Sequence, residues 1–189
     1  MATKNTKPIR TIIADPPWSE QGGGKIKRGA DRHYPLLTTD EIVAVLKSTI
    51  ESYKNADDQH MYLWVTNNFL VDGLFVLDQL GFDYKTNLVW VKPSFGLGQY
   101  FRGQHEICLF AIKGRGFNED LRTPNNDIAS VILAPKREHS RKPREFYDLV
   151  KRRSYGPYLE IFARTQPKPN WFVEGFDIGL FENGQKPIN

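Results

Sequence analysis

The stretch Asp15-Pro16-Pro17-Trp18 stands directly after a short apolar run and shortly before three consecutive glycines. Proline donates no backbone hydrogen bond and fixes its own φ, so two prolines end a strand rigidly instead of extending it. We therefore expect the Asp15 carboxylate and the Pro16 carbonyl to be held in one orientation, where each can accept a hydrogen bond. Trp18 offers an aromatic face on which a planar base can stack.

These groups suit a reaction at the exocyclic amino group of a nucleobase. The nitrogen is a poor nucleophile because its lone pair is delocalised into the ring. A site that activates it must accept hydrogen bonds from its N–H groups while an activated donor, usually S-adenosylmethionine, waits on the other side. Preorganised acceptors supply most of such a catalytic gain. Taken alone, the four residues are equally typical of a strand end with an Asx-type turn and a core tryptophan.

Apolar runs and helical periodicities alternate along the chain, which indicates an α/β fold. Strands are predicted at 11–14, 60–66, 82–93, 104–114, 129–135 and 158–164, and helices at 38–54, 67–81 and 142–154. The first helix has a capping box at Thr38 and Glu41. Continuous apolar strands predict a mostly parallel sheet with helices on both faces, where ligands bind beyond the carboxyl ends of the strands. Asp15 and Arg164 both occupy such positions.

Length and composition predict a single domain over residues 1–189. The chain has 40% hydrophobic and 25% charged residues, as ordinary globular domains do. It shows no apolar run long enough to span a membrane and no secretion signal, so we expect a cytoplasmic protein. Cys108 is its one cysteine, and we expect no metal site. The net charge of +4 favours an anionic partner. Residues 135–153 hold eight Lys/Arg against three acids, which alone indicates a solvated helix face.

The motif at residues 15–18 resembles the catalytic motif of the adenine amino-methyltransferases. That family includes the catalytic subunit of the eukaryotic mRNA adenosine methyltransferase and DNA enzymes of bacteria and phages. Further stretches resemble the family in the same order, at 32–42, 62–70, 81–94, 96–114, 139–154, 158–164 and 170–177. The resemblance covers about residues 9–177, leaving 178–189 as a loose tail. It implies a Rossmann-like fold that binds S-adenosylmethionine, circularly arranged so that the catalytic motif precedes the cofactor motif.

The resemblance also implies roles for individual residues. Asp15, Pro16, Pro17 and Trp18 would be catalytic, and Asp15 would also lie near the charged centre of the cofactor. Lys142, in a His-x-x-Lys-Pro motif, would pair with the methionine carboxylate of the cofactor. Arg164 would contact its ribose.

Two departures from the family affect the expected cofactor site. Where members usually carry Gly-Asn, this chain has Gly175-Phe176-Asp177, so Asp177 is the candidate replacement for the asparagine that contacts the ribose. The residues after Arg164 also differ, and Gln166 is included among the candidate cofactor-binding residues. We expect these departures to loosen cofactor affinity without abolishing activity.

On the substrate side, the resemblance implies that Tyr34, next to His33, lines the substrate pocket. The glycine-rich segment before it carries Lys25, Lys27 and Arg28, and we expect a mobile basic lid that orders on a nucleic-acid backbone. The pair His105-Glu106 lacks further ligands at metal-site spacing, which favours a buried polar pair that orients loops.

These observations together predict an S-adenosylmethionine-dependent enzyme that methylates the N6 amino group of adenine in DNA. The alternatives are the same chemistry on RNA and a catalytically silent, nucleic-acid-binding subunit. DNA is favoured by analogy with phage and bacterial enzymes that are bare catalytic domains. The sequence leaves the recognition site and the oligomeric state open and allows a homodimer.

Overall fold

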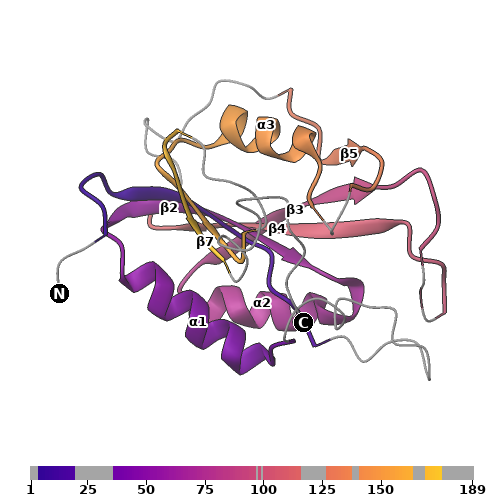
Figure 1. Cartoon of the computed structure of the whole chain (residues 1–189), viewed down its shortest axis with the longest axis horizontal. Coiled ribbons are helices and arrows are strands. Elements are labelled where there is room, and N and C mark those ends of the chain that lie inside the picture. Colours follow the sequence, from indigo (N-terminus) through magenta and orange to yellow (C-terminus); the bar gives the residue numbers. More distant parts are fainter. Residues whose placement is uncertain are drawn as a thin grey trace, which may run out of the picture.

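Figure 1 shows the computed structural model, which describes residues 4–19, 36–96, 98, 100–115, 127–137, 141–163 and 169–175. Its strands are β1 (Ile9–Ala14), β2 (Asn55–Val65), β3 (Asp83–Val91), β4 (His105–Lys113), β5 (Val131–Leu133), β6 (Tyr158–Ile161) and β7 (Trp171–Glu174). Its helices are α1 (Thr39–Glu51), α2 (Leu70–Gln79), α3 (Arg144–Arg153) and the short 3-10 helix η2 (Asn67–Phe69).

The described strands form one sheet in the order β5-β3-β4-β2-β1-β6-β7. Neighbours pair in parallel except at β4, which is antiparallel to both β2 and β3. The predicted α/β fold with a mostly parallel sheet is confirmed. The sequence analysis did not predict β7, a four-residue strand that pairs with β6 at the edge of the described sheet.

Local sequence signals account for the helix ends. The Thr38 hydroxyl accepts a hydrogen bond from the Glu41 backbone N–H at 3.3 Å, and the Glu41 carboxylate accepts one from the Thr38 N–H at 2.8 Å, which confirms the capping box. Gly81 follows α2 with φ +74°, a conformation that favours glycine. Pro143 lies one position earlier than predicted, at the N-cap of α3 instead of in its first turn.

Helices cover both faces of the sheet (Figure 1), with α1 and α2 on one face and α3 on the other. The core is accordingly divided into two clusters. The first contains Ile42 and Leu46 of α1 and Val76 and Leu77 of α2. The second contains, from α3, Phe146, Tyr147 and Val150.

The sheet brings distant parts of the chain to one edge. The carboxyl ends of β1, β2, β3 and β6 meet there, together with the amino end of the antiparallel β4. The residues that follow β1 and β3, and those that begin β4, therefore lie close together, as the sequence analysis expected for a ligand site in an open α/β sheet. Among the residues that the structure describes, no helix is both long and apolar enough to cross a membrane.

Candidate active site

The first element of the site is the turn that follows β1. The half-buried Asp15 comes directly after this strand. The Pro16 carbonyl accepts a hydrogen bond from the Trp18 N–H at 3.0 Å, and the Pro17 carbonyl accepts one from the Leu37 N–H at 2.9 Å. Because a carbonyl oxygen has two lone pairs, Pro16 keeps the capacity to accept a second bond from a substrate. The motif is thus fixed by its own backbone bonds.

Trp18 does not present the open stacking face that the sequence analysis expected. Only 4% of its surface is exposed, and it belongs to the core cluster under α1 and α2. Its indole N–H donates to the Trp64 carbonyl at 2.9 Å, and its ring stacks on Phe69 with the centroids 5.4 Å apart. The ring is covered by protein, so the structure corrects this expectation and supports the packing role for Trp18.

At this edge of the sheet, three strands carry a polar side chain two positions from a buried apolar one, on the same face of the sheet. Successive side chains of a strand alternate between its two faces, so residues two apart share a face. Each polar residue here stands two positions from a buried member of the cluster under α3: Asp15 after Ile13, Lys92 after Trp90, and Glu106 before Cys108. The three side chains therefore emerge on the same face of the sheet, the one that α3 covers.

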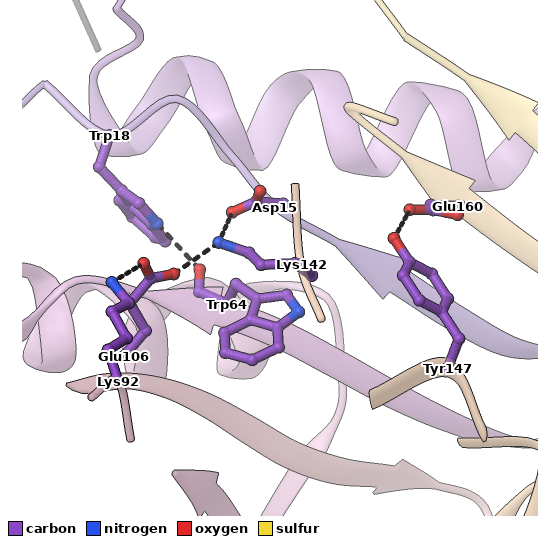
Figure 2. Close-up of polar contacts among 8 residues, drawn as sticks. All are labelled: Asp15, Trp18, Trp64, Lys92, Glu106, Lys142, Tyr147 and Glu160. Carbon is purple, nitrogen blue, oxygen red and sulfur yellow. Dashed lines mark hydrogen bonds and ion pairs between the residues drawn. The ribbon is translucent and has the colours of Figure 1, made fainter. Parts of the chain in front are cut away.

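Lys142 completes this group from the segment before α3. Figure 2 shows its ammonium between two carboxylates, 2.9 Å from Asp15 Oδ1 and 2.7 Å from Glu106 Oε2. The ammonium also lies over the Trp64 ring, 4.7 Å from its centroid, in the geometry of a cation–π contact. Lys142 is buried. The structure thus joins the two motifs that the resemblance identified as catalytic and cofactor-binding.

A second lysine extends the group. The Lys92 ammonium forms an ion pair with Glu106 Oε1 and lies over the Trp90 ring, 4.8 Å from its centroid. We call Asp15, Lys92, Glu106 and Lys142 the carboxylate–lysine network. With two carboxylates and two ammonium groups, its formal charges sum to zero, which is how buried charges are normally accommodated.

The charges of the network shift its pKa values. Burial would raise the pKa of Glu106, but the ammonium groups of Lys142 and Lys92 outweigh it and lower that pKa to about 2. Burial would likewise lower the pKa of Lys142, and the carboxylates of Asp15 and Glu106 outweigh it, so that the pKa lies above its ordinary value. Glu106 and Lys142 are therefore both ionised at neutral pH.

Packing of α3 fixes the position of Lys142. Phe146, one turn into the helix, is fully buried and packs edge-on against Trp64 with the centroids 4.8 Å apart. Tyr147 donates a hydrogen bond to Glu160 of β6 at 2.7 Å (Figure 2). The helix is thereby tied to two strands of the sheet. Lys142, two residues before α3, is placed by these contacts.

The sequence analysis missed Glu106 as a site residue. It expected His105 and Glu106 to form a buried polar pair, but His105 is exposed and only Glu106 joins the network, because adjacent strand residues face opposite sides. The signal that could have found Glu106 is a carboxylate at the buried parity of an apolar strand, which requires a cation nearby.

Several predicted residues lie outside the part of the chain that the structure describes: Lys25, Lys27, Arg28, His33, Tyr34, Arg164, Gln166 and Asp177. Gly175 and Ala163, which the structure describes, lie close to two of these residues in the sequence, Asp177 and Arg164. A Cβ added to Gly175 would clash with the Ala163 carbonyl, so the backbone after β7 passes close to the backbone after β6. The glycine that this chain shares with the family pattern therefore has a structural reason.

The network is compatible with the polar end of S-adenosylmethionine, the expected cofactor. That end carries an ammonium and a carboxylate, for which the Asp15 carboxylate and the Lys142 ammonium are complementary partners. Trp64, whose ring lies under the Lys142 ammonium, has a buried indole N–H that makes no hydrogen bond to any described residue. The donors and acceptors at this edge therefore fit the group that the resemblance implies.

Relatives of known description match most of the chain. The catalytic subunit METTL3 of the N(6)-adenosine-methyltransferase of Homo sapiens is 29% identical over 176 residues, which are 87% of this chain and 27% of that protein. The METTL3 subunit of Danio rerio is 30% identical over 176 residues, with the same two shares. The type II methyltransferase M.MunI of Mycoplasma sp is 26% identical over 193 residues, covering 89% of this chain and 78% of that protein.

The chain therefore spans about a quarter of the length of the METTL3 relatives and most of the length of M.MunI. The sequence model of the MT-A70 family matches residues 9–177, the same range over which the motifs agree, and within it the structure joins Asp15 to Lys142. The chain belongs to the MT-A70 family.

Proposed function

We propose that this protein transfers a methyl group from S-adenosylmethionine to the N6 amino group of adenine in DNA. Methyltransferases of the METTL3 type in this family use that cofactor. The observation that carries the proposal is the ion pair between Asp15 and Lys142 at the carboxyl end of β1. It joins the motif suited to an amine substrate to the lysine suited to the cofactor carboxylate.

The chemical role of Asp15 follows from its surroundings. Its Oδ1 contacts Lys142, and the carboxylate is half-buried beside the fixed Pro16 carbonyl. These two acceptors can hold the two N–H groups of an adenine amine and orient the nitrogen toward the cofactor. S-adenosylmethionine, when bound, supplies a strongly electrophilic methyl group. Orientation of the amine, which costs no reorganisation at the moment of reaction, is the contribution of the protein.

The carboxylate–lysine network fixes the position of the Asp15 carboxylate. Before any ligand arrives, the Glu106 carboxylate keeps Lys142 charged, and the Lys142 ammonium holds the Asp15 carboxylate in position. Asp15 therefore needs no large movement to meet the amine. A silent, nucleic-acid-binding subunit would have no need of a carboxylate and a lysine held in this way, and we favour an active enzyme.

DNA is proposed as the substrate over RNA on two grounds. The motif Asp15-Pro16-Pro17-Trp18 resembles the catalytic motif of bacterial and phage DNA enzymes. A type II methyltransferase, M.MunI of Mycoplasma sp, is also among the relatives, at 26% identity over 193 residues. Methylation of RNA adenosine is the second candidate, because the METTL3 relatives are named as adenosine methyltransferases.

The decisive experiment is incubation with methyl-labelled S-adenosylmethionine and four substrates of matched sequence: single- and double-stranded DNA and RNA. Digestion to nucleosides and mass analysis then locate the label. We expect N6-methyldeoxyadenosine from DNA, and none with the matched variant Asp15→Asn. N6-methyladenosine from RNA alone would replace the DNA proposal. Label in no nucleoside, despite measured cofactor binding, would support the silent subunit.

A further inference from the structure

The connection between β3 and β4, residues 92–104, exposes large aromatic side chains at the edge of the sheet that carries the network. The exposed fractions are 69% for Phe95, 94% for Tyr100 and 89% for Phe101. An aromatic side chain buries roughly 150–250 Å² when it packs, so leaving several in water forfeits a large stabilisation. Grouped exposed apolar surface of this kind marks an interaction site.

This connection is built to hold its aromatic residues outward. It begins as a hairpin, in which the Lys92 N–H donates to the Gln104 carbonyl at 2.8 Å and the Gly96 N–H donates to the Gly103 carbonyl at 2.6 Å. Arg102 Nε donates to the Gly96 carbonyl at 2.9 Å and ties the two sides together. In Figure 1 the connection between β3 and β4 projects beyond the end of the sheet.

Glycine is required for the close approach of the two sides. A Cβ on Gly98 would overlap the Phe101 carbonyl, and a Cβ on Gly96 would lie 3.0 Å from the Gly103 carbonyl. The backbone therefore leaves little room for the aromatic side chains to fold inward between the two sides.

The charge around these aromatic residues is positive. Residues 92–104 contain no acid, and because Glu106 neutralises Lys92, the exposed Arg102 supplies the positive charge of this connection. Lys136, from the segment after β5, lies beside the hairpin, since a Cβ on Gly96 would be 3.5 Å from its ammonium. Arginine has five N–H donors, so Arg102 keeps donors beyond the one that holds the hairpin. Aromatic faces flanked by cations are the combination that binds single-stranded nucleic acid.

The connection also starts inside the network. Lys92 contacts Glu106, which contacts Lys142, which contacts Asp15. Phe95 follows Lys92 by three residues, a span of at most about 10 Å. At about 3.4 Å per stacked base, that corresponds to about three nucleotides.

We infer that the side chains of Phe95, Tyr100, Phe101, Arg102 and Lys136 bind the nucleic-acid strand beside the target adenine. Tyr100 and Phe101 stack on unpaired bases, and Arg102 and Lys136 contact phosphates. The inference rests on the proposed function and names the surface that positions its substrate. A protein partner would also bury aromatic residues. The cations, the lack of acids and the direct link to the network favour nucleic acid.

The test compares the double variant Tyr100→Ala/Phe101→Ala with wild type in binding a fluorescently labelled single-stranded oligonucleotide over a range of salt concentrations. We expect affinity to fall by roughly 5- to 150-fold for each base that loses its stacking partner. The salt dependence should stay unchanged because no cation is removed. Arg102→Ala should instead reduce the slope of log affinity against log salt by about 0.7.

Three controls separate stacking from damage to the fold. Tyr100→Phe keeps the ring and should retain wild-type affinity. Tyr84→Ala removes an exposed tyrosine, 42% accessible, from the opposite end of β3 and should change nothing. Calorimetry with S-adenosylhomocysteine should give the same affinity for every variant, since none of these residues belongs to the network.

Wild-type oligonucleotide affinity in the double variant would overturn the inference. So would a change in its sedimentation from dimer to monomer without loss of affinity, because that result would assign the aromatic residues to a protein contact. Methyl transfer separates the two proposals. If wild type methylates DNA while the double variant keeps the wild-type KM, only the inference about this surface fails. If wild type binds the oligonucleotide through these residues but transfers no methyl group, the proposed function fails.

Discussion

Replacing Glu106 with Gln removes the charge that connects the two lysines of the network while keeping the size of the side chain. The Lys142 and Lys92 ammonium groups lower the pKa of Glu106 from 4.5 to about 2. At about 1.4 kcal/mol for each pH unit, this difference corresponds to about 3 kcal/mol of folding free energy. The value is an upper limit, because 25% of the side chain is exposed to water.

The sign of the pH dependence follows from the lowered pKa. A carboxyl whose pKa is lower in the folded than in the unfolded chain stabilises the fold fully above the unfolded value. The contribution of Glu106 should therefore be complete above about pH 5, shrink to about 1.4 kcal/mol at pH 3 and vanish well below pH 2. Glu106→Gln lacks this contribution at every pH, so it should differ from wild type most at neutral pH.

Urea unfolding followed by tryptophan fluorescence, at several pH values between 3 and 7, measures the difference directly. Glu51→Gln, an exposed site at the end of α1, controls for loss of one negative charge and should change the free energy of unfolding by less than about 0.5 kcal/mol at pH 7. A Glu106→Gln effect that stays constant with pH, or one below 1 kcal/mol at pH 7, would refute the ionic account of the network.

The other predictions concern the motif, the cofactor and the substrate. Asp15→Asn should abolish methyl transfer, and turnover above a few per cent of wild type would contradict its catalytic role. Lys142→Ala should weaken calorimetric binding of S-adenosylhomocysteine, which keeps the carboxylate, more than oligonucleotide binding; equal affinity would restrict the lysine to structure. Trp18→Ala should lower the free energy of unfolding by about 3–5 kcal/mol in urea, and a folding-neutral variant with impaired base capture would restore the stacking role. Replacing Lys25, Lys27 and Arg28 of the predicted lid together with Ala should lower the slope of log duplex affinity against log salt by about two to three and leave cofactor affinity unchanged. An unaltered slope would exclude phosphate contacts by these three residues.

The sequence was sufficient for the features that depend on neighbours in the chain. The capping box of α1 and the glycine after α2 involve residues within one turn of each other, so spacing alone predicts them. Continuous apolar strands alternating with helices likewise predict the α/β class. The pairing of the strands could not be predicted in this way, because the antiparallel insertion of β4 between β2 and β3 depends on long-range contacts that periodicity does not encode.

The network could be predicted only in part for the same reason. Resemblance to the family pointed to Asp15 and Lys142, which stand in motifs. Lys92 and Glu106 lie in stretches that resemble the family, 81–94 and 96–114, but the sequence analysis assigned neither of them a role in the site. Their pairing depends on the register of β3 against β4, which places Trp90 opposite Glu106. A reader who knew that register could have placed both on the face of α3 by parity alone.

The motif Asp15-Pro16-Pro17-Trp18 places its acidic and its aromatic side chain on opposite faces of the sheet. Asp15 continues the row of Ile13 toward α3, whereas Trp18 enters the core under α1 and α2. A regular strand would place residues 15 and 18 on opposite faces too, but it would also offer its backbone N–H groups to neighbouring strands. The prolines remove two of those donors. The Asp15 N–H still donates to the Ile161 carbonyl of β6 at 3.4 Å, and the bonds that follow close the turn on itself and onto Leu37. The buried tryptophan therefore anchors one side of the turn, and the Asp15 carboxylate is held on the other side, where Lys142 contacts it.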